Sequence, residues 1–225
     1  MTTATPVTIP IKQIHLTPGS LVTISDVSWE QFEAILKEIT EKRSTRLAYI
    51  KGTLEIMSPL PAHERPNRII ADLVKLLLDG QERDWEDFGS TTLRRKDKKA
   101  GLEPDTCLYI QNAQQVRDCM ESMDLTTVPP PDLAIETDVT SKTTLEAYEA
   151  IGVPEVWVYD QGKLKIHLLQ EGTYIESTTS PTFPNLPITD LIPKLVKQCL
   201  KQGSSQVLRN LRTEIARGTD NIMSS

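Results

Sequence analysis

Residues 132–139 have the sequence DLAIETDV, which is typical of a buried β-strand. Side chains of a strand point alternately to its two faces. One face of this segment is apolar and is expected in the core: Leu133, Ile135 and Val139. The opposite face is mainly acidic: Asp132, Ala134, Glu136 and Asp138. We therefore predict a central strand that presents carboxylates on one side.

Residues 103–110, with the sequence EPDTCLYI, predict a second strand of the same kind, with Glu103, Asp105 and Cys107 on one face. If the two strands are neighbours, Asp105 and Glu136 converge. Close carboxylates repel each other, and burial raises their pKa unless a cation compensates. The expected cation is Mg²⁺ or Mn²⁺, which would activate water and stabilise the leaving oxygen of a phosphodiester. The alternative is a solvated polar face, which half-exposed sheets show routinely.

The surrounding sequence alternates helical and strand periodicity. We predict helices at about 28–40, from Pro61 or Pro66 to Asp79, and at about 142–151. We also predict a hairpin of strands 46–51 and 53–57 and strand signals near 87–95. A meander of three strands is expected at 155–160, 163–169 and 173–177. Ser28 and Gln31 have the spacing of a capping box, and Gly52 suits the hairpin turn. This order predicts an α/β (α+β) fold, a mixed β-sheet flanked by helices.

The chain divides into three parts by composition. Residues 1–26 are a polar N-terminal extension, residues 27–187 are the expected domain, and residues 188–225 are a C-terminal helical extension. Two apolar stripes follow the last part: Leu191, Leu195, Val196 and Cys199, then Val207, Leu208, Leu211 and Ile215. These stripes either cap the domain or form a homodimer contact.

Composition excludes several classes of protein. Of the 225 residues, 38% are hydrophobic and 25% charged, which indicates a packed globular core. A net charge of −6 argues against a broad nucleic-acid-coating surface but permits a local basic track. No run approaches the roughly 20 apolar residues of a membrane span, and residues 1–10 lack a signal sequence, so we expect a cytoplasmic protein.

Several motifs together resemble one family. They are Met57-Ser58-Pro59, His63, Glu103-Pro104-Asp105, Pro131 to Glu136, Thr140-Ser141, and Tyr148 followed by residues 152–157 (GVPEVW). In this order they resemble the Uma-type family of bacterial endonucleases, long catalogued as a domain of unknown function. The resemblance covers roughly residues 28–185. It implies the restriction-endonuclease-like fold of the PD-(D/E)XK superfamily.

The resemblance also implies roles for single residues. Pro104-Asp105 is similar to the PD element, which makes Asp105 a metal ligand, and Glu136 is similar to the acidic residue of the (D/E)XK element and a second ligand. Glu64 is similar to a helical glutamate of some members, although a first-turn acid is also favoured by the helix dipole. His63 is placed at the mouth of the site, unless it is a surface or capping residue.

This sequence departs from the superfamily pattern at the lysine. Asp138 stands two residues after Glu136, where it would be a further metal ligand or only add negative charge. Many members supply a lysine from the following helix, at the place that Thr144 holds here. Lys142 is the nearest candidate for the catalytic charge, and its alternative is a solvated first-turn lysine.

The only dense basic run is at residues 94–99 (RRKDKK), which reads as a hairpin tip before Glu103. It is either a solvated loop or a segment that contacts the DNA backbone over the site.

The leading hypothesis is a Mg²⁺- or Mn²⁺-dependent endonuclease that hydrolyses phosphodiester bonds of nucleic acid, with DNA as the expected partner. Asp105, Glu136 and Asp138 would hold the metal, and Glu64 and Lys142 would assist catalysis. Two alternatives stay open: a nuclease-like module without catalysis that serves binding or assembly, and a metal hydrolase of another phosphoester.

Overall fold

The computed structural model describes residues 10–39, 45–119, 123–137 and 141–217. Within these ranges the strands form two six-stranded sheets. The first sheet has the order β1 (Leu21–Ile24), β3 (Thr53–Met57), β2 (Arg46–Ile50), β6 (Ala100–Leu102), β5 (Leu93–Arg95) and β8 (Met123–Asp124). The second has the order β12 (Thr173–Ser177), β11 (Lys163–Gln170), β10 (Glu155–Asp160), β9 (Leu133–Glu136), β7 (Thr106–Tyr109) and β4 (Glu86–Gly89). Each sheet contains one parallel pair, β5 with β8 and β9 with β10, so both are mixed.

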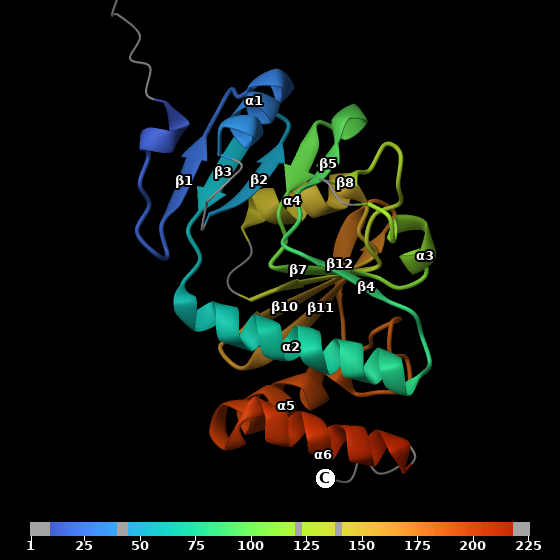
Figure 1. Cartoon of the computed structure of the whole chain (residues 1–225). Coiled ribbons are helices and arrows are strands. Elements are labelled where there is room, and N and C mark those ends of the chain that lie inside the picture. The colour runs from blue at the N-terminus through green and yellow to red at the C-terminus, as the bar shows by residue number, and fades with distance from the viewer. Residues whose placement is uncertain (1–9, 40–44, 120–122, 138–140, 218–225) are drawn as a thin grey trace, which may run out of the picture.

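Helices fill the space between the sheets and cover their outer faces (Figure 1). Helix α1 (Trp29–Ile39) packs on the outer face of the first sheet, and α4 (Lys142–Ile151) lies between the two sheets. Beyond the second sheet lie α2 (Pro61–Gly80), then α5 (Ile188–Gln202) and α6 (Ser204–Ala216). The short helices are η1 (Ile11–Gln13), η2 (Lys96–Lys98) and α3 (Ala113–Val116). The predicted α/β class, with mixed sheet flanked by helices, is confirmed, although the strands divide between two sheets.

Local sequence signals account for the element boundaries. The Ser28 N–H donates to Gln31 Oε1 at 2.7 Å and the Gln31 N–H donates to Ser28 Oγ at 3.2 Å, which is the predicted capping box. Gly52 takes a φ of +91° between β2 and β3, and Gly152 takes the same φ after α4. Both are left-handed conformations that glycine adopts without a steric penalty.

The C-terminal helices pack inside the molecule. The apolar residues of α5 and α6 join the core formed by α2 and the second sheet: Leu191, Leu195, Val196, Cys199, Val207 and Leu211. Gly80 ends α2 and has no side chain, which leaves room for Ile215 of α6. Most of the two stripes is therefore covered within the domain, as the capping alternative expects, whereas Leu208 and Ile215 are half-buried. No helix in the described ranges is both long and apolar enough to cross a membrane.

Candidate active site

Asp105 and Glu136 lie opposite each other at the end of two neighbouring strands. Strands β7 and β9 are antiparallel, with Thr106 paired to Ile135 and Cys107 to Ala134. The next step of this register sets Asp105 against Glu136, and both line one cavity of about 350 Å³. We call these two residues the carboxylate pair and this space the carboxylate cavity. The convergence inferred from strand alternation is thus present in the structure.

The carboxylate cavity forms where the chain crosses between the sheets. Strand β6 belongs to the first sheet and β7 to the second, so residues 103–105 bridge them. The Glu103 carboxylate accepts hydrogen bonds from the Leu47 N–H at 3.2 Å and the Thr92 hydroxyl at 2.7 Å, which fixes the crossing. From α2, Asn67 Nδ2 donates to the Asp105 carbonyl at 3.2 Å. Glu103 therefore supports the backbone that carries Asp105.

Burial dominates the electrostatics of the carboxylate pair. Glu136 is 8% exposed, and its pKa is raised well above the ordinary value by burial and then by the charge of Asp105. The Tyr148 hydroxyl donates to the Glu136 carboxylate and opposes this rise. The pKa of Asp105 is also raised by burial, against hydrogen bonds to its Oδ2 from the Thr137 N–H at 2.9 Å and hydroxyl at 2.8 Å. Two carboxyl groups that burial disfavours as anions thus face each other, and a bound cation would stabilise their charged forms.

Arg46, at the start of β2, is the cation next to this pair, and the sequence reasoning missed it. Its Nε lies 3.7 Å from Asp105 Oδ1, and its Nη2 lies 3.6 Å from Glu64 Oε1. The Nε atom is buried and has no hydrogen-bond acceptor among the described residues. Glu64 is half-buried and also approaches Arg68, at 3.8 Å. Arg46 therefore connects the predicted helical glutamate to the carboxylate pair.

The lysine expected near the site is not in the cavity. Lys142 has a side chain that is 90% exposed, and its Nζ lies 3.5 Å from Glu146 Oε1 on the same helix. Thr144, at the position where the resemblance led us to expect a lysine, does line the carboxylate cavity. The exposed position of Lys142 thus agrees with the alternative of a solvated first-turn lysine. Asp138 lies outside the described residues.

A further carboxylate was missed by the sequence reasoning. Glu55 of β3 lines the same cavity and accepts a hydrogen bond from the Ser141 hydroxyl at 2.5 Å. Ser141 also caps α4, because its Oγ accepts from the Thr144 N–H at 3.0 Å. Glu55 therefore fixes the first turn of the helix that carries Tyr148. Its signal was a lone acid among the apolar residues Leu54, Ile56 and Met57 of β3.

The donor chemistry of the pair fits a hard divalent cation. Mg²⁺ is held by one or two carboxylates, and its remaining positions go to water and substrate phosphate. The carboxylate pair supplies two such oxygen donors on facing strands, with raised pKa values that a bound cation would lower. Within the described ranges, no group of three or more His, Cys, Asp and Glu side chains could hold a metal. The donor set therefore suits an ion that relies on water and substrate for most of its shell.

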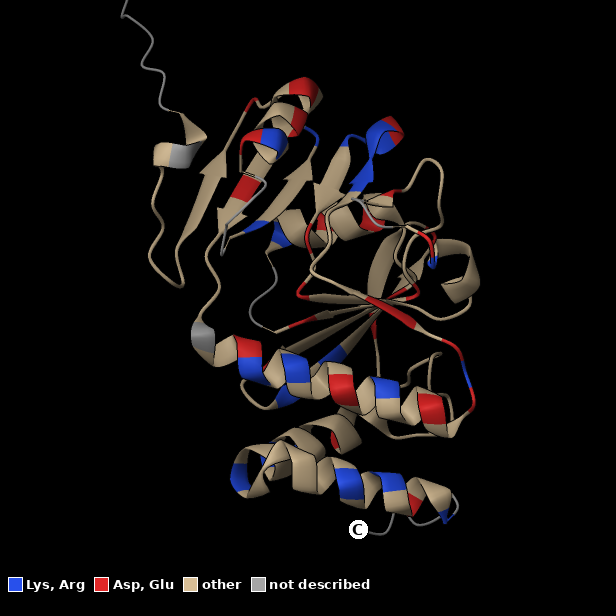
Figure 2. Cartoon of the chain, viewed as in Figure 1, with Lys and Arg blue, Asp and Glu red and all other residues tan. Residues whose placement is uncertain are grey.

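The basic run at residues 94–99 does not lie over this site. The register pairs Ala100 with Ile50 and Leu102 with Ala48, so the hairpin tip lies at the opposite end of β2 from Arg46. Figure 2 shows this tip as a blue cluster away from the start of α2. Arg95 Nη1 donates to the Ile151 carbonyl at 2.8 Å. The predicted contact with a DNA backbone over the site is thus wrong for this loop.

Residues 29–200 match the model of the Uma2 family, described as "Putative restriction endonuclease". The chain belongs to this family. The family resemblance inferred from the motifs is confirmed, and membership in the Uma2 family supports a nuclease. A comparison with curated proteins gave no match.

Among solved structures, the chain is similar to a protein titled "putative nuclease belonging to DUF820 from Anabaena variabilis ATCC 29413". The two are 16% identical, the alignment covers 81% of this chain and 99% of that chain, and the TM-score is 0.47.

Proposed function

We propose that this Uma2 protein is a divalent-metal-dependent endonuclease that hydrolyses phosphodiester bonds of DNA. The observation that carries the proposal is the carboxylate pair, opposed at the ends of β7 and β9, with Glu136 buried and the Asp105 side chain only 11% exposed. A Mg²⁺ or Mn²⁺ ion bound there would supply Lewis-acid stabilisation and a water activated for attack on phosphorus. Family membership supports the reaction class.

The chain's own residues would hold and orient the two ligands. Thr137 donates twice to Asp105, and Tyr148 donates to Glu136. These hydrogen bonds hold each carboxylate group in one orientation at the cavity. Such preorganised polar groups lower the cost of assembling a charged site. Thr137 and Tyr148 are therefore positioning residues for the two metal ligands.

Arg46 would provide the positive charge that a lysine gives elsewhere. Its guanidinium lines the carboxylate cavity beside Asp105, whereas Lys142 is on the helix surface. A guanidinium stays charged at all working pH values and binds phosphate through a planar fork. We expect Arg46→Lys to retain part of the cleavage rate and Arg46→Met to lose it, and equal rates in the two variants would remove this role.

Plasmid nicking tests the proposal. Wild type should nick supercoiled DNA with Mg²⁺ or Mn²⁺ and not with EDTA, and Asp105→Asn and Glu136→Gln should abolish nicking. Glu176→Gln is the matched control, because it makes the same change at a β12 carboxylate that is 60% exposed. Lys142→Ala should nick like wild type. Equal nicking by all variants would identify a contaminant and defeat the proposal.

A binding module without catalysis is the second candidate. It is favoured by the lack of a lysine among the described residues that line the carboxylate cavity. Calorimetric titration with Mn²⁺ separates the two candidates. A nuclease should bind the ion and lose that binding in Glu136→Gln, whereas an inert module should bind no ion at this face.

A further inference from the structure

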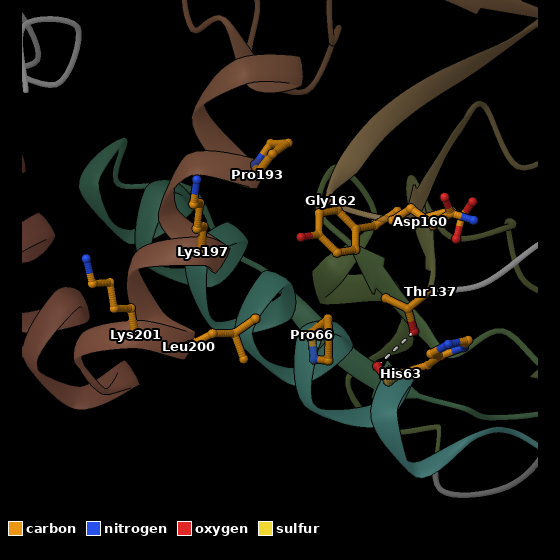
Figure 3. A pocket seen from close by; sticks show the side chains of 11 residues that line it. His63, Pro66, Thr137, Asp160, Gly162, Pro193, Lys197, Leu200 and Lys201 are labelled. Atoms are coloured by element: carbon orange, nitrogen blue, oxygen red, sulfur yellow. Dashed lines mark hydrogen bonds between the residues drawn. The ribbon is translucent and has the colours of Figure 1, made fainter.

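A second and larger cavity opens beside the carboxylate cavity. It has a volume of about 670 Å³ and lies between the start of α2, the turn after β10 and one side of α5 (Figure 3). We call it the α5 pocket. Figure 3 shows Leu200 directed from α5 toward Pro66 of α2, whereas Lys197 and Lys201 extend from the same helix away from Pro66. Cavities of roughly 300–1,000 Å³ accommodate one small organic ligand.

Thr137 lies between the α5 pocket and Asp105 of the carboxylate cavity. Thr137 lines the α5 pocket, and its hydroxyl lies 2.8 Å from Oδ2 of Asp105, which lines the carboxylate cavity. The same hydroxyl lies 3.2 Å from the His63 carbonyl, as the dashed line in Figure 3 shows. The α5 pocket therefore adjoins the place where a phosphate at Asp105 would sit.

The lining of the α5 pocket combines apolar surface with positive charge. Tyr159 and Leu200 contribute an aromatic ring and an aliphatic side chain that is 44% exposed. Lys197 and Lys201 are exposed and form no ion pair within the described part of the chain. Asp160 also lines the pocket, and Figure 3 shows its side chain directed away from Leu200.

We propose that the α5 pocket binds an unpaired nucleotide of the substrate strand, adjacent to the bond that is cut. The base would pack against Tyr159 and Leu200, and Lys197 and Lys201 would bind its phosphate. Base–aromatic packing is worth roughly 1–3 kcal/mol per base and tolerates any sequence. The inference rests on the proposed nuclease function and adds to it a preference for single-stranded or unpaired substrate.

Fluorescence anisotropy with a labelled single-stranded oligonucleotide tests the lysines, with Ca²⁺ in place of Mg²⁺ and a gel to show that the strand stays uncut. The double variant Lys197→Gln/Lys201→Gln should bind roughly 5–10-fold more weakly. Its salt slope should fall by about 0.7, since the two lysines bind one phosphate and each phosphate contact on a single strand contributes about 0.7. The matched control is Lys98→Gln/Lys99→Gln, the same charge change at the hairpin tip, which should bind like wild type. Equal losses in the two double variants would overturn the assignment.

An abasic strand tests the base. Leu200→Ser should weaken binding of the normal oligonucleotide and leave an abasic oligonucleotide of the same length unaffected. Equal effects on both strands would mean that only the backbone is held and would overturn the nucleotide assignment. Residues 197, 200 and 201 are exposed, so the lysine double variant and Leu200→Ser should both keep the fold, which circular dichroism checks. If the protein binds the oligonucleotide as expected but never cleaves it with Mg²⁺, the nuclease function fails. If the protein cleaves but Lys197→Gln/Lys201→Gln binds as tightly as wild type, only the pocket assignment fails.

Discussion

Tyr148→Phe isolates the hydrogen bond that holds Glu136. Tyr148 is fully buried between the sheets, and its hydroxyl donates to the buried Glu136 carboxylate. The substitution keeps the ring and removes only the donor. A hydrogen bond to a charged group contributes roughly 1.5–3 kcal/mol. For a chain of this size that corresponds to a fall in melting temperature of roughly 3–12 °C, at about 2–4 °C per kcal/mol.

The loss should depend on pH in one direction. Burial, followed by the charge of Asp105, raises the pKa of Glu136, and the Tyr148 hydrogen bond opposes this rise. An acid with a raised folded-state pKa keeps its proton longer in the folded state, so stability is lost as pH rises through that pKa. Without Tyr148 the pKa of Glu136 rises further. The stability deficit of Tyr148→Phe should therefore be larger at pH 8 than at pH 5.

Urea unfolding in EDTA, followed by circular dichroism at both pH values, measures the deficit. The control is Tyr109→Phe, because Tyr109 is buried in the same core and its hydroxyl donates to the neutral Pro129 carbonyl at 3.1 Å. That variant should lose roughly 0.5–1.5 kcal/mol at either pH. If the two variants show the same pH dependence, Glu136 carries no buried charge and the electrostatic reasoning fails.

Three further substitutions test the site and the fold. Glu136→Gln should melt at a higher temperature than wild type at pH 8 in EDTA, because it removes a buried charge facing Asp105, and a lower melting temperature would contradict this reason. The same variant should show no Mn²⁺ binding by calorimetry. Ser141→Ala should cost roughly 0.5–2 kcal/mol in urea unfolding through loss of the α4 cap, and an unchanged midpoint would refute that role. Gly101→Ala should cost roughly 1–3 kcal/mol, since a Cβ there would lie 2.6 Å from the Phe32 ring, and unchanged stability would show that the ring can move.

Sequence alone predicted the features that depend on short-range periodicity. The capping box, the Gly52 turn and the strand alternation each follow from residues a few positions apart. Alternation also predicted that Asp105 and Glu136 share a face, and the antiparallel register then sets them opposite each other. One face of a strand is fixed by its own sequence, so this part of the site could be inferred.

The parts that sequence missed come from the packing of distant elements. Arg46 and Glu55 belong to the first sheet, and they reach the cavity only because the chain crosses between sheets at residues 103–105. The helical period, in contrast, could have excluded Lys142. Thr144 lies four residues before buried Tyr148 and shares its face, whereas a residue six positions before Tyr148 lies on the other side of the helix.

Crystals soaked in Mn²⁺ and measured for anomalous scattering test the central claim most directly, which is that the carboxylate pair holds one divalent ion. We expect a single strong peak roughly 2.0–2.6 Å from one carboxylate oxygen of Asp105 and one of Glu136. The peak should be absent in Glu136→Gln crystals grown in the same way. A peak that contacts only one of the two residues, or no peak in the carboxylate cavity at saturating Mn²⁺, would contradict the proposed metal site.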